Sequence, residues 1–254
     1  MEGQASELEA APQPVLPDGR PELIVHLGDA FERIGEDGRT ERQASVIFAG
    51  QLTNQLLLKP TGRIAVAAVR FRPDGASALL AIPQSELIGL TAPVEEVAPA
   101  IFGRLADVLE ESATPAQAAA LLLDALEPRL RAAAPDRRIR HVVDAIEARR
   151  GLLSIDRVAR EAGMTRRHLE RRFHQLVGLS PKRLARVARF QHALSRIEGS
   201  EGHGARTAAE CGYADQAHFI RDFRALAGCA PGAHLLQRGE LTGFFTGTGV
   251  ARPR

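Results

Sequence analysis

The chain has 254 residues, of which 44% are hydrophobic and 25% are charged, and its formal net charge is +2. This is the composition of a globular protein, and the length suits two domains of ordinary size. The apolar runs fall far short of the ~20 residues that a transmembrane helix needs. The acidic start, MEGQASELEAAPQPVLPDG, lacks the apolar core of a signal peptide. We therefore expect a cytoplasmic protein with no membrane partner.

Charge is distributed unevenly along the chain. Residues 137–239 hold 20 Arg and Lys against 10 Asp and Glu, whereas residues 1–136 hold 11 against 20. A basic segment of this size attracts a polyanion, and its association with DNA would depend steeply on the salt concentration. The acidic half would limit indiscriminate binding.

The N-terminal half has the pattern of a small β-rich domain. Residues 1–20 are acidic and then proline-rich, with no periodicity, and we expect them to be disordered. From residue 21 onward, short apolar runs rich in β-branched residues alternate with turn-forming residues. The runs cover residues 22–28, 44–50, 55–60 and 63–73. They predict a cupin-like sandwich or barrel within a domain that spans residues 21–135.

Two helices are expected to end this domain, over residues 97–111 and 115–134. Thr114 followed by Pro115 is typical of an N-cap and a first helical position. Pro128 should kink or end the second helix. Each helix carries an apolar stripe, which would pack either on the sheet or on a second subunit.

The N-terminal half has few side chains of the kinds that bind metals or catalyse reactions. It has no cysteine and one histidine, His26, which alternates with apolar neighbours as an ordinary strand residue does; a ligand role is the alternative. A cupin-type metal site needs several imidazoles and a carboxylate, so we expect no metal or cofactor. Arg70 and Arg72 project to one side of a strand. They are candidates to clamp an anionic effector, or they are surface or ion-paired arginines. Cys211 and Cys229, in the other half, are too few for a disulfide framework.

The segment from Ser154 to Pro181, SIDRVAREAGMTRRHLERRFHQLVGLSP, has the pattern of a helix-turn-helix. Gly163 suits the left-handed position that ends a first short helix. In the helix that follows, Leu169, Phe173 and Leu176 recur at spacings of four and three, so one face is apolar and the opposite face is basic. A second helix of this kind can lie in the DNA major groove.

The same pattern returns later in the chain. VAREAGMTRRHLERRFHQLVGLSP, residues 158–181, lines up with TAAECGYADQAHFIRDFRALAGCAP, residues 207–231. Both copies share a glycine after the first helix and the ending F-x4-G-x-x-P. A single helix-turn-helix pattern is a weak signal, but two in tandem with the same ending are a strong one.

These residues resemble the DNA-binding half of the AraC/XylS family of transcriptional regulators. GYADQAHFIRDFRALAGCAP is similar to the signature of the family's second motif, and GLSPKRL to the join after the first. The resemblance covers residues 137–239 and implies seven helices, with two helix-turn-helix units bridged by one long helix. We expect an α+β protein with this all-α domain at residues 136–239 and a flexible tail at residues 240–254. The N-terminal half loosely resembles the family's β-rich regulatory domains, which implies effector sensing or dimerisation.

Outward-facing side chains of the two recognition helices are the candidates for base contact, as the resemblance also implies. Arg suits guanine O6 and N7, Gln suits adenine, and Glu accepts from the cytosine amino group. In the alternatives, Glu170 only orients neighbouring arginines and His218 packs. Backbone amides at the Ser180-Pro181 helix start would anchor a phosphate. The candidates are Arg166, Arg167, Glu170, Arg171, His174, Ser180, Lys182, Gln216, Ala217, His218 and Arg221.

Together these patterns predict a sequence-specific DNA-binding transcription regulator of AraC/XylS type, an activator or a repressor and not an enzyme. Its expected partners are double-stranded DNA and a small-molecule effector, with RNA polymerase and a second copy of the chain as further candidates. One alternative is an architectural DNA binder that responds to no effector. The less favoured one is a DNA-tethered enzyme, because the N-terminal half lacks both a catalytic constellation and the reactive cysteines of an alkyl acceptor.

Overall fold

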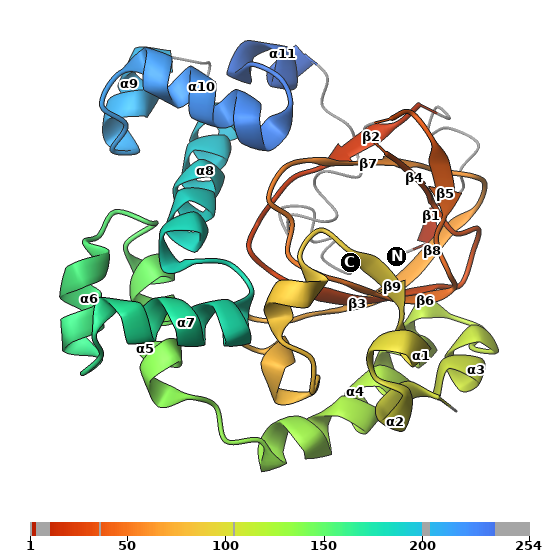
Figure 1. Ribbon diagram of the computed structural model, residues 1–254. Helices are drawn as coiled ribbons and strands as arrows, with labels where there is room; N and C mark the ends of the chain where they lie inside the picture. Colours follow the sequence, from red (N-terminus) through yellow and green to blue (C-terminus); the bar gives the residue numbers. More distant parts are fainter. Residues whose placement is uncertain (1, 4–10, 36, 104, 200–203, 237–254) are drawn as a thin grey trace.

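The computed structural model describes residues 2–3, 11–35, 37–103, 105–199 and 204–236. A β-rich N-terminal domain lies beside an all-helical C-terminal domain (Figure 1). The predicted α+β class and its order along the chain are therefore confirmed. The expected tail, residues 240–254, lies outside the described residues.

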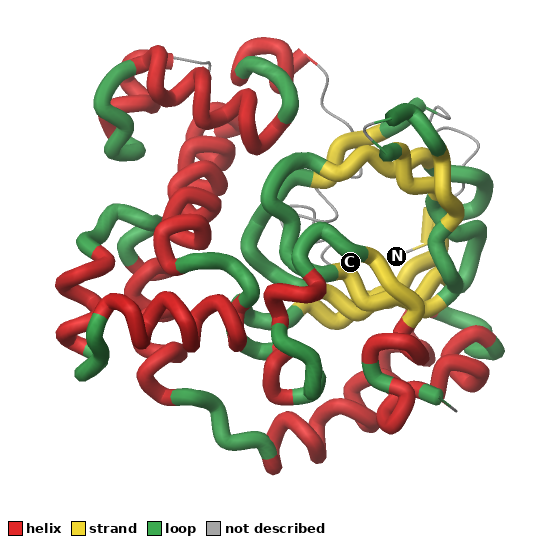
Figure 2. Tube along the Cα trace, in the orientation of Figure 1, coloured by secondary structure: helices red, strands yellow, loops and turns green. Residues whose placement is uncertain are grey.

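In the described part of the chain, the strands form two antiparallel sheets that close into a barrel (Figure 2). The five-stranded sheet has the order β1-β8-β3-β6-β9, and the four-stranded sheet has the order β2-β7-β4-β5. The strands are β1 (Glu2–Gly3), β2 (Gln13–Val15), β3 (Glu22–His26), β4 (Glu32–Ile34), β5 (Thr40–Arg42), β6 (Val46–Ala49), β7 (Leu56–Lys59), β8 (Ile64–Arg70) and β9 (Thr91–Pro93).

Strand β3 shows how the two faces of the larger sheet differ. Leu23 and Val25 pack on the outer face, against helices. Ile24 between them packs inside the barrel, with Ile47 of β6 and Val66 of β8. Because side chains alternate along a strand, the even-numbered residues of β3 all face the interior.

Short helices cover the outer face of this sheet. The sequence predicts one helix over residues 97–111, but the chain breaks there: Ala98 has φ −147° and ψ 62°, and Pro99 starts a new helix because it has no N–H to continue the previous one. Thr114 caps the last of these helices as predicted, accepting from the Gln117 N–H at 3.2 Å. Pro128 stands inside that helix without ending it. The helices are η1 (Ala76–Ala78), η2 (Gln84–Leu87), α1 (Val94–Val97), α2 (Pro99–Phe102), α3 (Leu105–Glu110) and α4 (Pro115–Ala132).

The N-terminal segment differs from the disorder expected for residues 1–20. Gln13–Val15 forms β2, an edge strand that pairs with β7, and Leu16 is only 2% exposed. Pro14 is tolerated there because an edge strand has one side that needs no hydrogen-bond donor. Burial of Val15 and Leu16 supplies the apolar contact that orders this short stretch.

Seven helices follow in the described part of the C-terminal half, as the resemblance implies. The first three enclose one apolar core, and the last three pack with the second half of α8 around another. Helix α8 joins the two: Leu184 lies in the first core, and Phe190 and Leu194 lie in the second. The helices are α5 (Arg137–Ala148), α6 (Ile155–Glu161), α7 (Arg166–Val177), α8 (Pro181–Gly199), α9 (Gly204–Glu210), α10 (Gln216–Ala227) and α11 (Pro231–Leu236).

The described residues show neither a membrane-spanning helix nor a metal-binding cluster. No helix among them has the length and apolar character to cross a membrane, and they contain no group of three or more His, Cys, Asp or Glu side chains placed to hold a metal ion. Both cysteines are free thiols; Cys211 is buried and Cys229 is half-buried.

Candidate nucleic-acid interface

The first helix-turn-helix is α6 and α7. Thr165 caps α7, its hydroxyl oxygen accepting from the His168 N–H at 3.2 Å. Gly163 makes the turn before it with φ +64°, a left-handed conformation that side chains with a Cβ resist. Leu169 and Phe173 are fully buried in the core of the unit. The cap, the turn glycine and the two buried side chains together fix the orientation of α7, so that its basic face points outward.

The second unit, α9 and α10, repeats this construction. Asp215 caps α10, its carboxylate accepting from the His218 N–H at 2.6 Å, and Gly212 makes the turn with φ +68°. Phe219 and Phe223 fill the core, with ring centroids 5.8 Å apart. The cap and the turn glycine thus occupy equivalent positions in the two units.

Two of the outward residues of α7 are paired with each other. Arg166 Nε lies 3.1 Å from Glu170, and its Nη1 lies 3.1 Å from Asp156 of α6. The hydrogen bond that Arg166 donates to Glu170 raises the pKa of the Arg166 guanidinium, and the charge of Asp156 adds to this effect. Glu170 thus orients a neighbouring arginine, as one of the sequence-based alternatives held.

Other candidates on the recognition helices are exposed and unpaired. Arg167 and Arg171 of α7 and Arg221 of α10 make no ion pair with any described residue. His174 on α7, and Gln216 and Ala217 at the start of α10, are also exposed. Guanidinium groups without an internal partner are free to donate to bases or phosphates.

His218 differs from these residues because it is half-buried. Its ring meets Tyr213 edge-on, with ring centroids 5.3 Å apart, and its Nδ1 accepts from the Ala214 N–H at 3.4 Å. The packing role is therefore observed, and it leaves little of the ring for a base. At the start of α8, Ser180 accepts from the Arg183 N–H at 3.2 Å while Lys182 is exposed.

Sequence analysis missed the residues that hold the second recognition helix on the bridging helix. Asp222 of α10 makes an ion pair with Arg186 of α8, and its other oxygen accepts from the Tyr213 hydroxyl at 3.2 Å. Burial raises the pKa of the Tyr213 hydroxyl, and the nearby Asp222 charge adds to this. Arg189 of α8 lies over the same ring, 5.4 Å from its centroid. The sequence signal for this contact is Asp222 itself, an acidic residue between the arginines of α10.

The two effector candidates are both held in ion pairs. Arg70 contacts Asp18 of the N-terminal segment and lies 3.2 Å from Glu22 at the start of β3. Arg72 crosses to α5, where it contacts Asp144 and lies 3.5 Å from Glu147. Neither guanidinium is free to clamp an anion, because each joins parts of the protein that are distant in sequence.

Comparisons with known proteins agree with this geometry. A family model described as a helix-turn-helix domain matches residues 158–237, and one described as a domain of unknown function (DUF6597) matches residues 1–93. No curated protein matches the chain.

Several solved structures resemble parts or most of the chain. ToxT from Vibrio cholerae is 12% identical over 89% of this chain and 95% of that chain, with a TM-score of 0.50. A transcriptional regulator with an AraC-type DNA-binding domain from Chromobacterium violaceum is 26% identical over 41% of this chain and 94% of that chain, with a TM-score of 0.38. A probable AraC family regulator from Rhodopseudomonas palustris is 27% identical over 40% and 97%, with a TM-score of 0.37.

Two helix-turn-helix units on one bridging helix, beside a β-barrel domain, define a two-domain protein with a helix-turn-helix DNA-binding domain. The matched helix-turn-helix model and the tandem motifs show that the chain carries an AraC-type helix-turn-helix domain in its C-terminal half.

Proposed function

We propose that the chain reads a specific DNA sequence with α7 and α10 in two successive major grooves, and that its N-terminal domain adjusts this binding in response to a small molecule. One observation carries the first part. Arg167, Arg171 and Arg221 are exposed and unpaired, whereas Arg166, Arg172 and Arg186 beside them are held in ion pairs. The unpaired arginines point outward from the two equivalent helices of a tandem repeat.

The spacing of such units sets the form of the expected operator. Successive major grooves on one face of DNA lie about 34 Å apart, so one chain would cover an asymmetric site of roughly two helical turns. In this proposal Arg167, Arg171 and Arg221 contact bases, with Gln216 suited to adenine. Lys182 and the amides at the start of α8 contact the phosphate backbone.

Selection of random duplexes by the full chain tests this proposal. We expect a long asymmetric sequence, and Arg171→Ala should lose about 1–3 kcal/mol on that sequence and relax the preference at one base pair. Arg39→Ala is the matched control, since Arg39 is an exposed arginine of the barrel domain whose ion pair among the described residues is with Asp37. Equal loss on selected and scrambled DNA would leave Arg171 with a phosphate contact only.

The effector part is tested separately from the DNA part. An architectural binder would show the same DNA affinity with every small molecule tried, whereas a regulator of the proposed kind changes its affinity with one of them. The described residues show no metal cluster for a tethered enzyme, and no observation in the barrel favours a catalytic role.

A further inference from the structure

The two helix-turn-helix units have separate apolar cores, and α8 contributes to both of them. This helix has 19 residues and is therefore roughly 28 Å long, and helices of such length are commonly curved. A single shared helix does not by itself fix the angle between α7 and α10. A second connection runs beside it: the α5–α6 corner, residues 149–152, lies against α8 and reaches the second unit.

The backbone of the α5–α6 corner lies directly on α8. Gly151 has φ +75°, and an added Cβ would come 1.9 Å from the carbonyl oxygen of Ala185 and 3.1 Å from the backbone nitrogen of Arg189. Only glycine fits such a close approach in a left-handed conformation. Because Ala185 and Arg189 are one helical turn apart, the corner is held at a defined place along α8.

Arg150, just before this glycine, has a strained backbone. Its φ is +50°, and among the residues that the structure describes it is the only one other than glycine with a positive φ. Side chains with a Cβ resist this conformation, so it persists where surrounding contacts hold it, often at functional positions. Here the contact is with α8, because Arg150 donates from Nη1 to Nε2 of His192 at 2.6 Å.

The charge state of His192 suits this hydrogen bond. Burial lowers the pKa of its imidazole, and the positive charges of Arg150 and Arg196 lower it further. The ring is therefore neutral at neutral pH, and its Nε2 can accept from the guanidinium. This polar contact ties the corner to the half of α8 that carries the second unit.

Leu152 extends the corner into the second unit. It is 43% exposed and lies outside the two apolar cores that the described residues form in this domain. An added Cβ on Gly212 would come 2.3 Å from Cδ2 of Leu152 and 3.4 Å from its Cδ1. Gly212 makes the turn between α9 and α10, so a side chain of the first unit touches the turn that sets the direction of the second recognition helix.

The equivalent glycine of the first unit lacks such a neighbour. Gly163 has φ +64° and Gly212 has φ +68°, so both turns have the same backbone conformation. No described atom lies within 4 Å of an added Cβ on Gly163. The contact with Leu152 is therefore not needed to build a turn of this kind, and it serves to join the two units.

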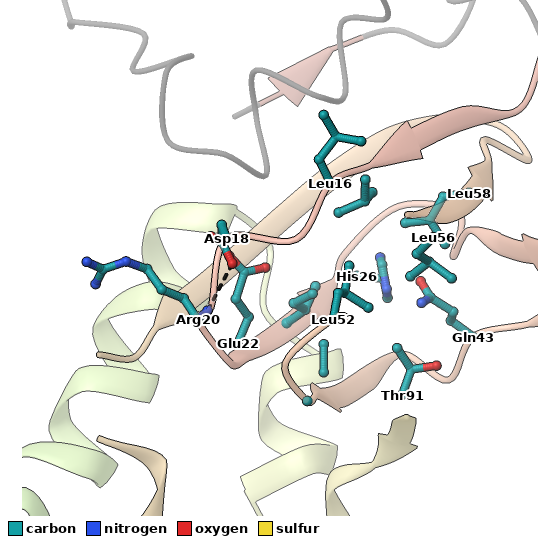
Figure 3. Close-up of a pocket in the computed structure, with 14 residues that line it drawn as sticks. Leu16, Asp18, Arg20, Glu22, His26, Gln43, Leu52, Leu56, Leu58 and Thr91 are labelled. Carbon is teal, nitrogen blue, oxygen red and sulfur yellow. Dashed lines mark hydrogen bonds between the residues drawn. The ribbon is translucent and has the colours of Figure 1, made fainter. Parts of the chain in front are cut away.

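The segments on both sides of this contact are held in place. Glu147, in the last turn of α5, accepts from Arg20 of the barrel domain at 2.6 Å. Figure 3, a view of the barrel interior, shows Arg20 extending away from the other side chains drawn there. On the other side, Glu210 of α9 makes ion pairs with Arg196 of α8 and, at 2.8 Å, with Arg206. The contact thus joins two anchored segments.

We propose that Leu152 and Arg150 are positioning residues, which fix the angle and distance between the two recognition helices so that the chain accepts its two half-sites at one spacing only. Each base pair inserted between the half-sites moves one groove by about 3.4 Å and turns it by about 34–36° around the duplex. Units held rigidly cannot follow this displacement, whereas units joined by α8 alone can bend toward it. This inference rests on the proposed function for its DNA readout and names the residues that set the operator spacing.

Binding of the full chain to duplexes of altered spacing tests this proposal. The duplexes are the selected sequence and the same sequence with one base pair inserted or removed between the parts that α7 and α10 contact. We expect the wild type to bind the altered duplexes at least about tenfold more weakly. Leu152→Ala should bind the selected duplex within about threefold of the wild type and should lose most of the spacing penalty. A wild type that tolerates the altered spacings would overturn the proposal.

Two further variants separate positioning from a general loss of structure. Arg150→Gly keeps the left-handed backbone but removes the contact with His192, so it should also reduce the spacing penalty. Leu123→Ala is the matched control, because Leu123 is an exposed leucine of the barrel domain, and it should keep the penalty of the wild type. If Leu152→Ala keeps the full penalty, or weakens binding equally on every duplex, Leu152 is not a positioning residue.

A second measurement needs no DNA and so distinguishes a failure of this inference from a failure of the proposed function. Spin labels are attached at Arg160→Cys in α6 and Ala225→Cys in α10, both exposed positions, with Cys211 and Cys229 replaced by alanine. Pulsed electron paramagnetic resonance should give one narrow distance distribution, and a clearly broader one when Leu152→Ala is added. Equal widths would overturn the inference whatever the DNA result. Broadening in a protein that selects no specific duplex would support the inference and count against the proposed function.

Discussion

Val15 lies in the core of the barrel, and the next residue, Leu16, lies in the core of the second helix-turn-helix unit. Successive side chains of an extended segment point to opposite sides, so a single peptide unit joins two hydrophobic cores. This segment therefore connects the domains in addition to the chain between α4 and α5 and to ion pairs such as that of Arg72 with Asp144. A substitution of Val15 or Leu16 should therefore destabilise both domains.

Truncation of Leu16 should weaken the joint between the domains. Leu16→Ala removes a side chain that is 2% exposed from a packed core, and such changes cost about 2–5 kcal/mol of unfolding free energy. Leu123→Ala is the matched control, because Leu123 is 56% exposed on α4 and surface truncations usually stay within about 0.5 kcal/mol. Urea denaturation followed by circular dichroism gives both values; equal losses would show that Leu16 contributes no buried contact.

Two glycines of the first helix-turn-helix unit, Gly178 at the end of α7 and Gly163 in the turn before it, should differ in their tolerance of alanine. Gly178 has φ +90° and lies against backbone, since an added Cβ would be 2.8 Å from the carbonyl oxygen of Gln84. Gly163, with φ +64°, has nothing within 4 Å of that position. Gly163→Ala should therefore lower the free energy of unfolding only by the strain of a left-handed alanine, about 1–2 kcal/mol. Gly178→Ala should lower it by more, because its Cβ also meets the backbone of Gln84. Thermal denaturation of the two variants measures both losses. Equal losses would show that the contact between Gly178 and Gln84 of η2 does not limit the space for a side chain.

At the equivalent glycine of the second unit, the obstructing atoms belong to a side chain. An added Cβ on Gly228 would meet the Gln55 amide, which can be removed by mutation. Gly228→Ala should therefore be partly rescued by Gln55→Ala, with a coupling energy in the range of about 0.5–3 kcal/mol for residues in contact. A double-mutant cycle on unfolding free energy measures this coupling, and strictly additive costs would show that Gln55 does not contact α10.

The DNA-binding half could be predicted in detail because its signals are local. Caps, turn glycines and apolar spacing act within a few residues, so Thr165, Gly163 and Phe173 are informative without knowledge of the rest of the fold. The pairing of Glu170 with Arg166 was foreseeable as an alternative for the same reason. Its position four residues away on one helix brings the two side chains together.

The barrel half was harder because its decisive contacts join distant residues. Leu16 is isolated among prolines and acidic residues in the sequence, and only a core contributed by α8 orders it. The partners of Arg72 lie on α5, more than seventy residues away. Period-two spacing places His26 on a strand, but it cannot say whether the interior holds a hydrogen-bond partner.

Burial of the His26 ring predicts a pH dependence of stability. Its pKa is about 4 in the folded protein against an ordinary 6.5, so the unfolded chain binds more protons between these values. The free energy of unfolding therefore falls as the pH is lowered through this window. His26→Leu has no group that titrates at this position. Its free energy of unfolding relative to that of the wild type should therefore rise by up to about 3 kcal/mol when the pH is lowered from 7 to 4.

Glu22, on the same face of β3, acts in the opposite direction. Burial raises its pKa to about 7, so the folded state binds more protons between pH 4.5 and pH 7, and stability from this group rises as the pH falls. Both the wild type and His26→Leu contain Glu22, so their difference isolates the histidine. Urea denaturation at several pH values measures this difference. Parallel curves for the two proteins would show that His26 is solvated in the folded state.

Removal of Asp222 should loosen the second recognition helix while leaving the first intact. Asp222 holds Arg186 of α8 and the Tyr213 hydroxyl, and its side chain is 10% exposed. Asp222→Ala leaves both groups without a partner, which should cost about 1–3 kcal/mol of unfolding free energy.

The effect of Asp222→Ala on DNA should be confined to one half of the operator. Footprinting on the selected duplex should show weaker protection where α10 binds and unchanged protection where α7 binds, because α7 is held to α5 by a separate ion pair between Arg172 and Asp136 at 2.9 Å. Asp156→Ala is the matched control in the first unit, since Asp156 is an exposed partner of Arg166. Uniform weakening over both halves would mean that the two units bind as one inseparable body and that Asp222 sets the stability of the whole domain.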